Sequence, residues 1–121
     1  MIKFFVEDIG IDNEAKDSSG YTTLNIASVT DQQGIVEYLV ERGADIETYN
    51  NYRNTPLINA SRYVDDTNII KFLFDQGANT FHRNNKGEIF YSYLTIEQKV
   101  EIQDYVRDIQ HHKVMIKPHL R

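Results

Sequence analysis

The chain has 121 residues, 40% of them hydrophobic and 12% aromatic, which suffices for one domain with a modest core. Its formal net charge of -5 gives no long-range attraction to phosphate backbones or anionic lipid, so we expect neither a nucleic acid nor a membrane partner. Cysteine is absent, which excludes disulfides, thiolate metal sites and cysteine nucleophiles. The apolar run at residues 1–6 is too short for a signal peptide. We therefore expect a cytoplasmic protein, in the cytosol of the producing cell or of a host.

A repeated pattern organises the chain, because residues 17–49 align with residues 50–83. The matched pairs are Thr22 with Thr55, Leu24 with Leu57, Ala27 with Ala60, and Gly43 with Gly77. The first three pairs lie 33 residues apart and the last lies 34 apart. The second copy therefore carries one extra residue, which we expect in a turn between helices.

Residues 1–16 fit the end of an earlier copy whose first helix is missing, so the chain begins in mid-unit. A repeat covers its apolar side only against neighbours, so this partial repeat should leave an exposed apolar edge. The edge residues are Ile2, Phe4 and Phe5. Three explanations stay open: a second copy pairs there, the chain is a fragment of a longer array, or it is truncated.

Each full copy carries signals for two helices. Thr22 and Thr55 are suitable N-caps and Pro56 suits a first helical position, so a short helix is expected after each threonine. A second apolar run at helical spacing ends at Gly43 or Gly77, where a left-handed C-cap is expected. The turn-rich segments that follow predict projecting, hairpin-like loops.

The C-terminal segments differ from the full copies. Residues 84–110 restart the pattern in degenerate form and are expected to cap the stack, with residues 90–94 in the place of the short helix. Thr95 and Gln98 form a capping box for a longer helix. Residues 111–121 carry three basic residues, no acid and a proline, which predicts a flexible basic tail.

These motifs resemble the ankyrin repeat. Residues 17–24 read D-x-x-G-x-T-x-L, residues 43–46 read G-A-D-I, residues 54–57 read N-T-P-L and residues 77–79 read G-A-N. The resemblance implies an all-α solenoid of stacked antiparallel helix pairs with projecting loops. It also implies that the concave face and loop tips bind another protein, and it implies no enzyme activity, small-molecule substrate or cofactor.

The sequence departs from the ankyrin pattern at several positions. Asn25 and Ile58 stand where the family usually has histidine, which should weaken hydrogen bonding between repeats. Ile89, Phe90 and Tyr91 replace the T-P-L motif in the last unit, so that unit is a cap or a decayed copy.

Side chains that could support chemistry do not converge in this pattern. Asp65 and Asp66 lie together in a turn, which favours helix capping over acid–base catalysis. The histidines lie in one loop tip and in or near the tail, so we expect no metal site. They are His82, His111, His112 and His119.

The predicted loop tips are the strongest candidates for binding. Residues 14–21, 47–54 and 81–88 carry formal charges of -1, 0 and +1, so the acidic residues lie largely on the helices. Tyrosine and arginine, which are enriched at binding hot spots, occur on these tips and on the inner helix. The candidate partner-binding residues are Tyr21, Tyr49, Tyr52, Arg53, Arg62, Tyr63, Arg83 and Lys86.

The function predicted from the sequence is therefore that of a protein–protein interaction module. It would bind an unidentified partner protein through the concave face and loop tips of a short stack. The alternative is a structural capping fragment, or a truncated piece of a longer ankyrin scaffold, with no partner of its own.

Overall fold

The computed structural model describes the backbone of residues 14–116 and the side chains of residues 14–109. Most of the predicted partial repeat at residues 1–16, including its apolar edge, therefore lies outside the described residues. Within the described part there are helices and no strands. The elements are α2 (Thr23–Val29), α3 (Gln33–Glu41), α4 (Pro56–Tyr63), α5 (Asn68–Asp75), the 3-10 helix η1 (Phe90–Tyr93) and α6 (Ile96–Ile116).

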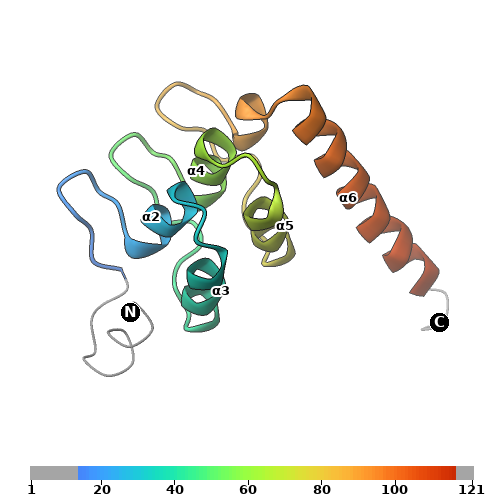
Figure 1. Ribbon diagram of the computed structural model, residues 1–121, viewed down its shortest axis with the longest axis horizontal. Helices are drawn as coiled ribbons and strands as arrows, with labels where there is room; N and C mark the ends of the chain where they lie inside the picture. The colour runs from blue at the N-terminus through green and yellow to red at the C-terminus, as the bar shows by residue number, and fades with distance from the viewer. Residues whose placement is uncertain (1–13, 117–121) are drawn as a thin grey trace.

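The helices form two rows, and three long loops project from the same side of the stack (Figure 1). The inner row contains α2, α4 and η1, and the outer row contains α3 and α5. Neighbouring helices of the inner row pack against each other, and α2 and α4 each pack against the outer helix that follows in the chain. This arrangement is an all-α solenoid of antiparallel helix pairs, as the resemblance to ankyrin repeats implies.

The inner helices begin at the predicted threonine caps. The Thr22 hydroxyl accepts a hydrogen bond from the Asn25 backbone N–H at 3.2 Å, and the Thr55 hydroxyl accepts one from the Ile58 N–H at 3.4 Å. Each bond satisfies a donor that the first helical turn leaves free. Pro56 occupies the first position of α4, where no N–H is needed.

The extra residue of the second copy lies in the turn between helices, as its offset predicts. Residues 30–32 join α2 to α3, and residues 64–67 join α4 to α5. In the longer turn the Asp66 carboxylate accepts a hydrogen bond from the Asn68 N–H at 3.0 Å, although Asp66 precedes the N-cap residue Thr67, whose side chain makes no capping bond.

One continuous apolar core lies between the two rows of helices. Eight of its large residues are at most 1% exposed, and each contributes about 1.5–3 kcal/mol relative to full exposure. These residues are Leu24, Val36, Leu39, Leu57, Ile58, Ile69, Ile70 and Leu73. The core spans both copies, so neither copy buries its apolar side without the other.

The two departures from the family histidine have different outcomes. The Asn25 amide nitrogen donates to Thr48 O at 3.4 Å and to Asn54 O at 3.5 Å, both in the loop that leads to the next repeat. These bonds are at the long limit of hydrogen-bond geometry, and the expected weakening relative to histidine stays a prediction. Ile58 has no polar side-chain atom, so it can make no hydrogen bond to a neighbouring repeat through its side chain.

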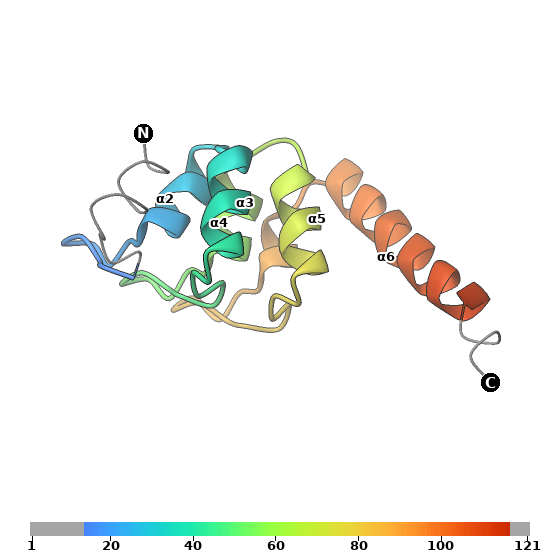
Figure 2. The ribbon, with the colours of Figure 1, turned by 90° about the horizontal axis from the view of Figure 1, so that it is seen from below.

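The C-terminal unit has a much shorter inner element than the full copies. η1 is a single 3-10 turn of four residues, whereas α4 has eight. The predicted capping box opens α6: Thr95 N–H donates to Gln98 Oε1 at 2.9 Å, and Gln98 N–H donates to Thr95 Oγ1 at 3.1 Å. The C-terminal half of α6 then extends away from the stack (Figure 2).

Helix α6 also extends beyond its predicted end. It continues to Ile116, into the segment for which the sequence predicts a flexible tail. The physical reason is composition, because residues 110–116 contain neither glycine nor proline and the first helix breaker is Pro118. Among the described residues, no helix is long and apolar enough to cross a membrane.

Candidate partner-binding surface

The three projecting loops share one turn, built around Asp17, Asn50 and Asn84. In each loop the side-chain Oδ1 of this residue accepts hydrogen bonds from the backbone N–H groups two and four residues later, at 2.9–3.0 Å. Short Asp and Asn side chains suit this geometry because they reach their own backbone without strain. The loop tips are therefore held in one defined shape.

A left-handed residue closes each turn. Gly20 and Gly87 have φ angles of +81° and +74°, whereas Arg53 occupies the equivalent place in the middle loop with φ +61°. Glycine adopts this conformation freely, but for a residue with a Cβ atom it costs about 1 kcal/mol. Arg53 therefore keeps a strained backbone at a position where the other two loops have glycine.

Hydrogen bonds also join neighbouring loop tips. The Asn51 N–H donates to Ser19 O at 3.0 Å, and the Asn85 N–H donates to Tyr52 O at 3.0 Å. The Asn85 side chain adds a bond from Nδ2 to Asn51 O at 3.1 Å. Because of this ladder, side chains at matched positions of successive loops lie next to one another.

The most densely packed set on the tips centres on Tyr49, which is 39% exposed. Lys16 Nζ lies 5.1 Å from the centre of its ring and Arg53 Cζ lies 4.7 Å from it. The His82 ring stacks on it with a centroid distance of 5.8 Å. Lys16 Nζ also donates to Tyr49 O at 2.9 Å. One aromatic ring thus collects basic side chains from three successive loops.

A second set lies where α4 meets the third loop. Arg62 Cζ is 5.0 Å from the ring centres of both Tyr63 and Tyr93. Tyr93 Oη donates to Glu88 Oε1 at 2.5 Å and accepts from Asn84 Nδ2 at 2.8 Å. Burial, followed by the hydrogen bond to Glu88, raises the pKa of the Tyr93 phenol, so this group remains a donor at neutral pH.

The structure thus brings four of the eight candidate residues together in pairs. Tyr49 lies against Arg53, and Arg62 lies against Tyr63. Both pairs are arginine–tyrosine stacks, and both tyrosines stay partly exposed, at 39% and 50%.

The other four candidates lie apart from these pairs. Tyr52 is 61% exposed at the tip of the middle loop, and Lys86 is exposed at the matched position of the third loop. Tyr21 is half-buried. Arg83 bends back over its own turn, where Nη1 donates to Gly87 O at 2.6 Å.

The eight candidates omit Lys16, His82 and Tyr93, which the structure places in the two sets. A signal for Lys16 is present in the sequence, because Lys16 and Tyr49 lie 33 residues apart and occupy one position of the repeat. The 34-residue offset of the next loop places Arg83 at that position, so the repeat does not mark His82. Tyr93 carries no comparable signal, since its repeat is degenerate.

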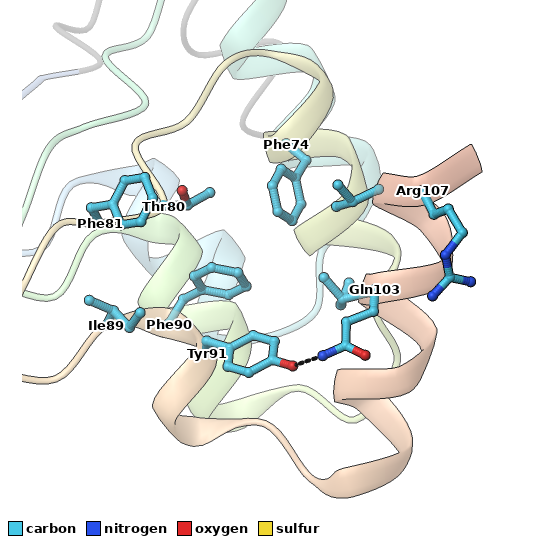
Figure 3. A pocket seen from close by; sticks show the side chains of 10 residues that line it. Phe74, Thr80, Phe81, Ile89, Phe90, Tyr91, Gln103 and Arg107 are labelled. Carbon is cyan, nitrogen blue, oxygen red and sulfur yellow. Dashed lines mark hydrogen bonds between the residues drawn. The ribbon is translucent and has the colours of Figure 1, made fainter. Parts of the chain in front are cut away.

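An apolar groove lies on another part of the molecule, between α5, the third loop, η1 and α6 (Figure 3). Its volume is about 630 Å³, and Phe81 in its wall is 80% exposed. Gln103 Nε2 donates to Tyr91 Oη across one side at 2.5 Å. The lining residues are Phe74, Thr80, Phe81, Ile89, Phe90, Tyr91, Ile102, Gln103, Val106 and Arg107. The lining contains no carboxylate and no imidazole.

Metal-ligating residues do not gather within the described part of the chain, where no group of three or more His, Asp or Glu could hold an ion. His82 lies against Tyr49, and its Nε2 is 2.9 Å from Arg53 O. The side chains of His111, His112 and His119 lie outside the described residues.

Stacked helix pairs with joined, projecting loops define the class of this protein as a helical repeat solenoid. A family model for ankyrin repeats, in three copies, matches residues 1–84. The chain therefore belongs to the ankyrin repeat family. Ankyrin repeats are in general protein–protein interaction modules, and the family is typically non-enzymatic.

Two relatives are similar over different lengths. An ankyrin repeat protein of Acanthamoeba polyphaga mimivirus is 31% identical over 106 residues, which is 88% of this chain and 14% of that protein. Delta-latroinsectotoxin-Lt1a of Latrodectus tredecimguttatus is 40% identical over 45 residues, which is 37% of this chain and 4% of the toxin. The chain thus spans a small part of the length of either relative.

Proposed function

We propose that the chain binds a partner protein through its loop tips and the adjoining inner helices. The observation that carries this proposal is the exposed set around Tyr49, to which three successive loops each contribute a side chain. A rigid aromatic ring with cations around it offers large contact area at a low entropic cost, as binding hot spots do.

The strained backbone of Arg53 supports the same surface. A left-handed arginine costs stability where glycine would cost none, and such strain persists at positions that function uses. The proposed contact residues are the eight candidates together with Lys16 and His82. We propose no catalytic step and no cofactor for this surface.

The test uses the double variant Tyr52→Ala/Tyr63→Ala, because these rings are 61% and 50% exposed. Partners captured from lysate by the full chain are identified by mass spectrometry, and the double variant is expected to lose them while its helical circular dichroism stays unchanged. The control is Ile96→Ala/Val100→Ala, which removes apolar side chains that are 78% and 52% exposed from α6. Capture that survives the tyrosine variant contradicts the proposed site.

The alternative function, a capping or truncated piece of a longer scaffold, predicts a different result. A chain that is monomeric by size-exclusion chromatography with light scattering and captures nothing supports this alternative. A dimer in that measurement supports self-association, for which the sequence offers the apolar edge at Ile2, Phe4 and Phe5.

A further inference from the structure

Five basic side chains lie on the loop side: Lys16, Arg53, Arg62, Arg83 and Lys86. Among the residues that the structure describes, none of the five forms an ion pair with a carboxylate within 4 Å. Three of them lie over tyrosine rings instead. A cation stacked on a ring keeps N–H donors at its rim, and these donors can still bind an anion.

The carboxylates of the loop side are used within the fold. Glu14 Oε2 accepts a hydrogen bond from the Asp45 N–H at 2.9 Å, and Glu47 Oε2 accepts one from the Asn79 N–H at 2.8 Å. Glu88 accepts from a tyrosine, and Asp17 holds its own turn. The backbone N–H groups partly compensate the charges of these acids, and each bond fixes a loop.

The inner helices add no acid to this side. α2, α4 and η1 contain no Asp or Glu, and Arg62 is their one charged residue. On the outer side, formed by α3, α5 and α6, two ion pairs are present. Lys71 Nζ lies 2.8 Å from Glu101, and Arg107 Nη1 lies 2.8 Å from Asp104. Lys99 of α6 lies over the Tyr91 ring at 5.2 Å instead. Two outer-side cations are thus paired with carboxylates, whereas none of the five loop-side cations is so paired among the described residues.

We infer that the partner presents an acidic peptide segment that also carries apolar side chains. This inference rests on the proposed function and names the chemistry of the partner. Its carboxylates would meet Arg53 and Arg62, whose planar guanidinium groups suit carboxylate geometry. Its apolar side chains would meet Tyr52, Tyr63 and Ile26, which are 45–61% exposed. A uniformly charged polymer such as nucleic acid fits less well, because the chain as a whole is negative.

The test is a selection of short random peptides, displayed on phage, against the full chain. We expect the enriched peptides to have a net negative charge and at least one large apolar residue. Binding of the corresponding synthetic peptides should weaken when the ionic strength rises from about 0.05 M to about 0.5 M, because exposed ion pairs are screened.

Matched charge variants locate the interaction. Arg53→Gln/Lys86→Gln should weaken binding of the acidic peptides by about tenfold or more, the scale of losing one or two charge-assisted bonds. Lys71→Gln/Arg107→Gln removes the same charge from the outer helices and should leave binding unchanged. Arg53→Gly removes the guanidinium in a form that suits the left-handed turn, so a loss of binding there is not a folding defect.

The outcomes separate this inference from the proposed function. Enriched peptides that are neutral or basic, yet depend on Tyr52 and Tyr63, overturn the acidic partner and leave the proposed function standing. Selection of no peptide that depends on these tyrosines or on the loop cations overturns both. A single-stranded RNA oligonucleotide of equal charge that competes as well as the acidic peptide overturns the assignment to a peptide.

Discussion

The loop side and the outer-helix side of this stack both carry cations that lie over tyrosine rings, but they differ in their ion pairs. On the outer side, Lys71 pairs with Glu101 and Arg107 pairs with Asp104, so opposite charges meet within the chain. On the loop side, Arg53 and Arg62 lie over tyrosine rings, and nearby acids bind the chain's own donors. Exposed ion pairs contribute at most about 1 kcal/mol each, so the outer pairs tune stability weakly. The comparison separates residues that hold the stack together from residues that remain available to a partner.

The largest effect is expected from Gly20→Ala, which disturbs the contact between the first and second loop tips. A Cβ atom there would lie 2.5 Å from Asn51 Oδ1 and 2.9 Å from Asn51 N, in addition to the strain of φ +81°. We expect a loss of about 2 kcal/mol in the free energy of unfolding, measured by urea denaturation.

Gly87→Ala is the control for that change. Its φ is +74°, but a Cβ atom would meet nothing within 4 Å, so only the backbone strain of about 1 kcal/mol applies. Equal losses for the two alanines would show that the contact between loops contributes nothing.

A smaller effect is expected on the outer side from Tyr105→Phe. Tyr105 Oη donates to both carboxylate oxygens of Asp75, at 2.8 and 2.7 Å, and so links α6 to α5. Loss of this bond should cost about 1 kcal/mol and leave partner binding unchanged. The hydrogen bond to Asp75, with burial, raises the pKa of Tyr105, so its contribution is complete below about pH 10 and is lost as the pH rises through the folded-state pKa.

Tyr52→Phe is the matched control, because it removes an exposed hydroxyl from the other side of the molecule. Its unfolding free energy should equal that of the unmodified chain. A Tyr105→Phe variant that is equally stable would contradict a role for the Asp75 bond in docking α6.

Arg53→Gly should change stability and binding in opposite directions. Relief of about 1 kcal/mol of left-handed strain exceeds the loss of about 0.5 kcal/mol from the cation–π contact with Tyr49, so a net gain of about 0.5 kcal/mol is expected. Thermal unfolding measures the gain, and the captured partner or selected peptide measures the loss of affinity. If stability falls as well, Arg53 belongs to the fold and the proposed division between the two sides is wrong at this residue.

The smallest effect is expected from Glu101→Gln and depends on pH. Hydrogen bonds from Lys71 and Thr67 lower the pKa of Glu101, so its ionised form stabilises the fold above the usual carboxyl pKa of about 4. That contribution is lost as the pH falls through the lowered pKa. Because the side chain is 51% exposed, the difference from the unmodified chain should stay below about 1 kcal/mol at pH 7 and vanish in acid.

Glu97→Gln, in the first turn of the same helix, provides the comparison, since it removes an exposed carboxylate without an ion-pair partner among the described residues. A pH-dependent difference for both variants would mean that helix position, and not Lys71, determines the effect.

The first residues of the helices and the position of the inserted residue could be predicted, because local capping signals agree with the repeat. Thr22 and Thr55 cap helices in any context that supplies the apolar run behind them, and the change of offset from 33 to 34 residues placed the insertion in a turn. The Thr95 and Gln98 capping box is equally local. Such features depend on a few neighbouring residues, which the sequence displays directly.

Other features depend on contacts between repeats, and these could not be predicted from one repeat at a time. The left-handed backbone of Arg53 follows from its alignment with Gly20 and Gly87, not from the preference of arginine. Likewise, His82 stacks on Tyr49 although Arg83, and not His82, holds the matched position of the repeat.

The hydrogen bonds between loop tips hold matched side chains of successive repeats in register. Each repeat contributes one side chain to a given row, as Ser19, Tyr52 and Lys86 do, and the ladder keeps their order and spacing fixed. A linear partner that lay along the tips would therefore contact the repeats one after another. Specificity could then be changed one repeat at a time. Ser19→Tyr would add a contact at the first loop without altering the contacts made by the other two loops.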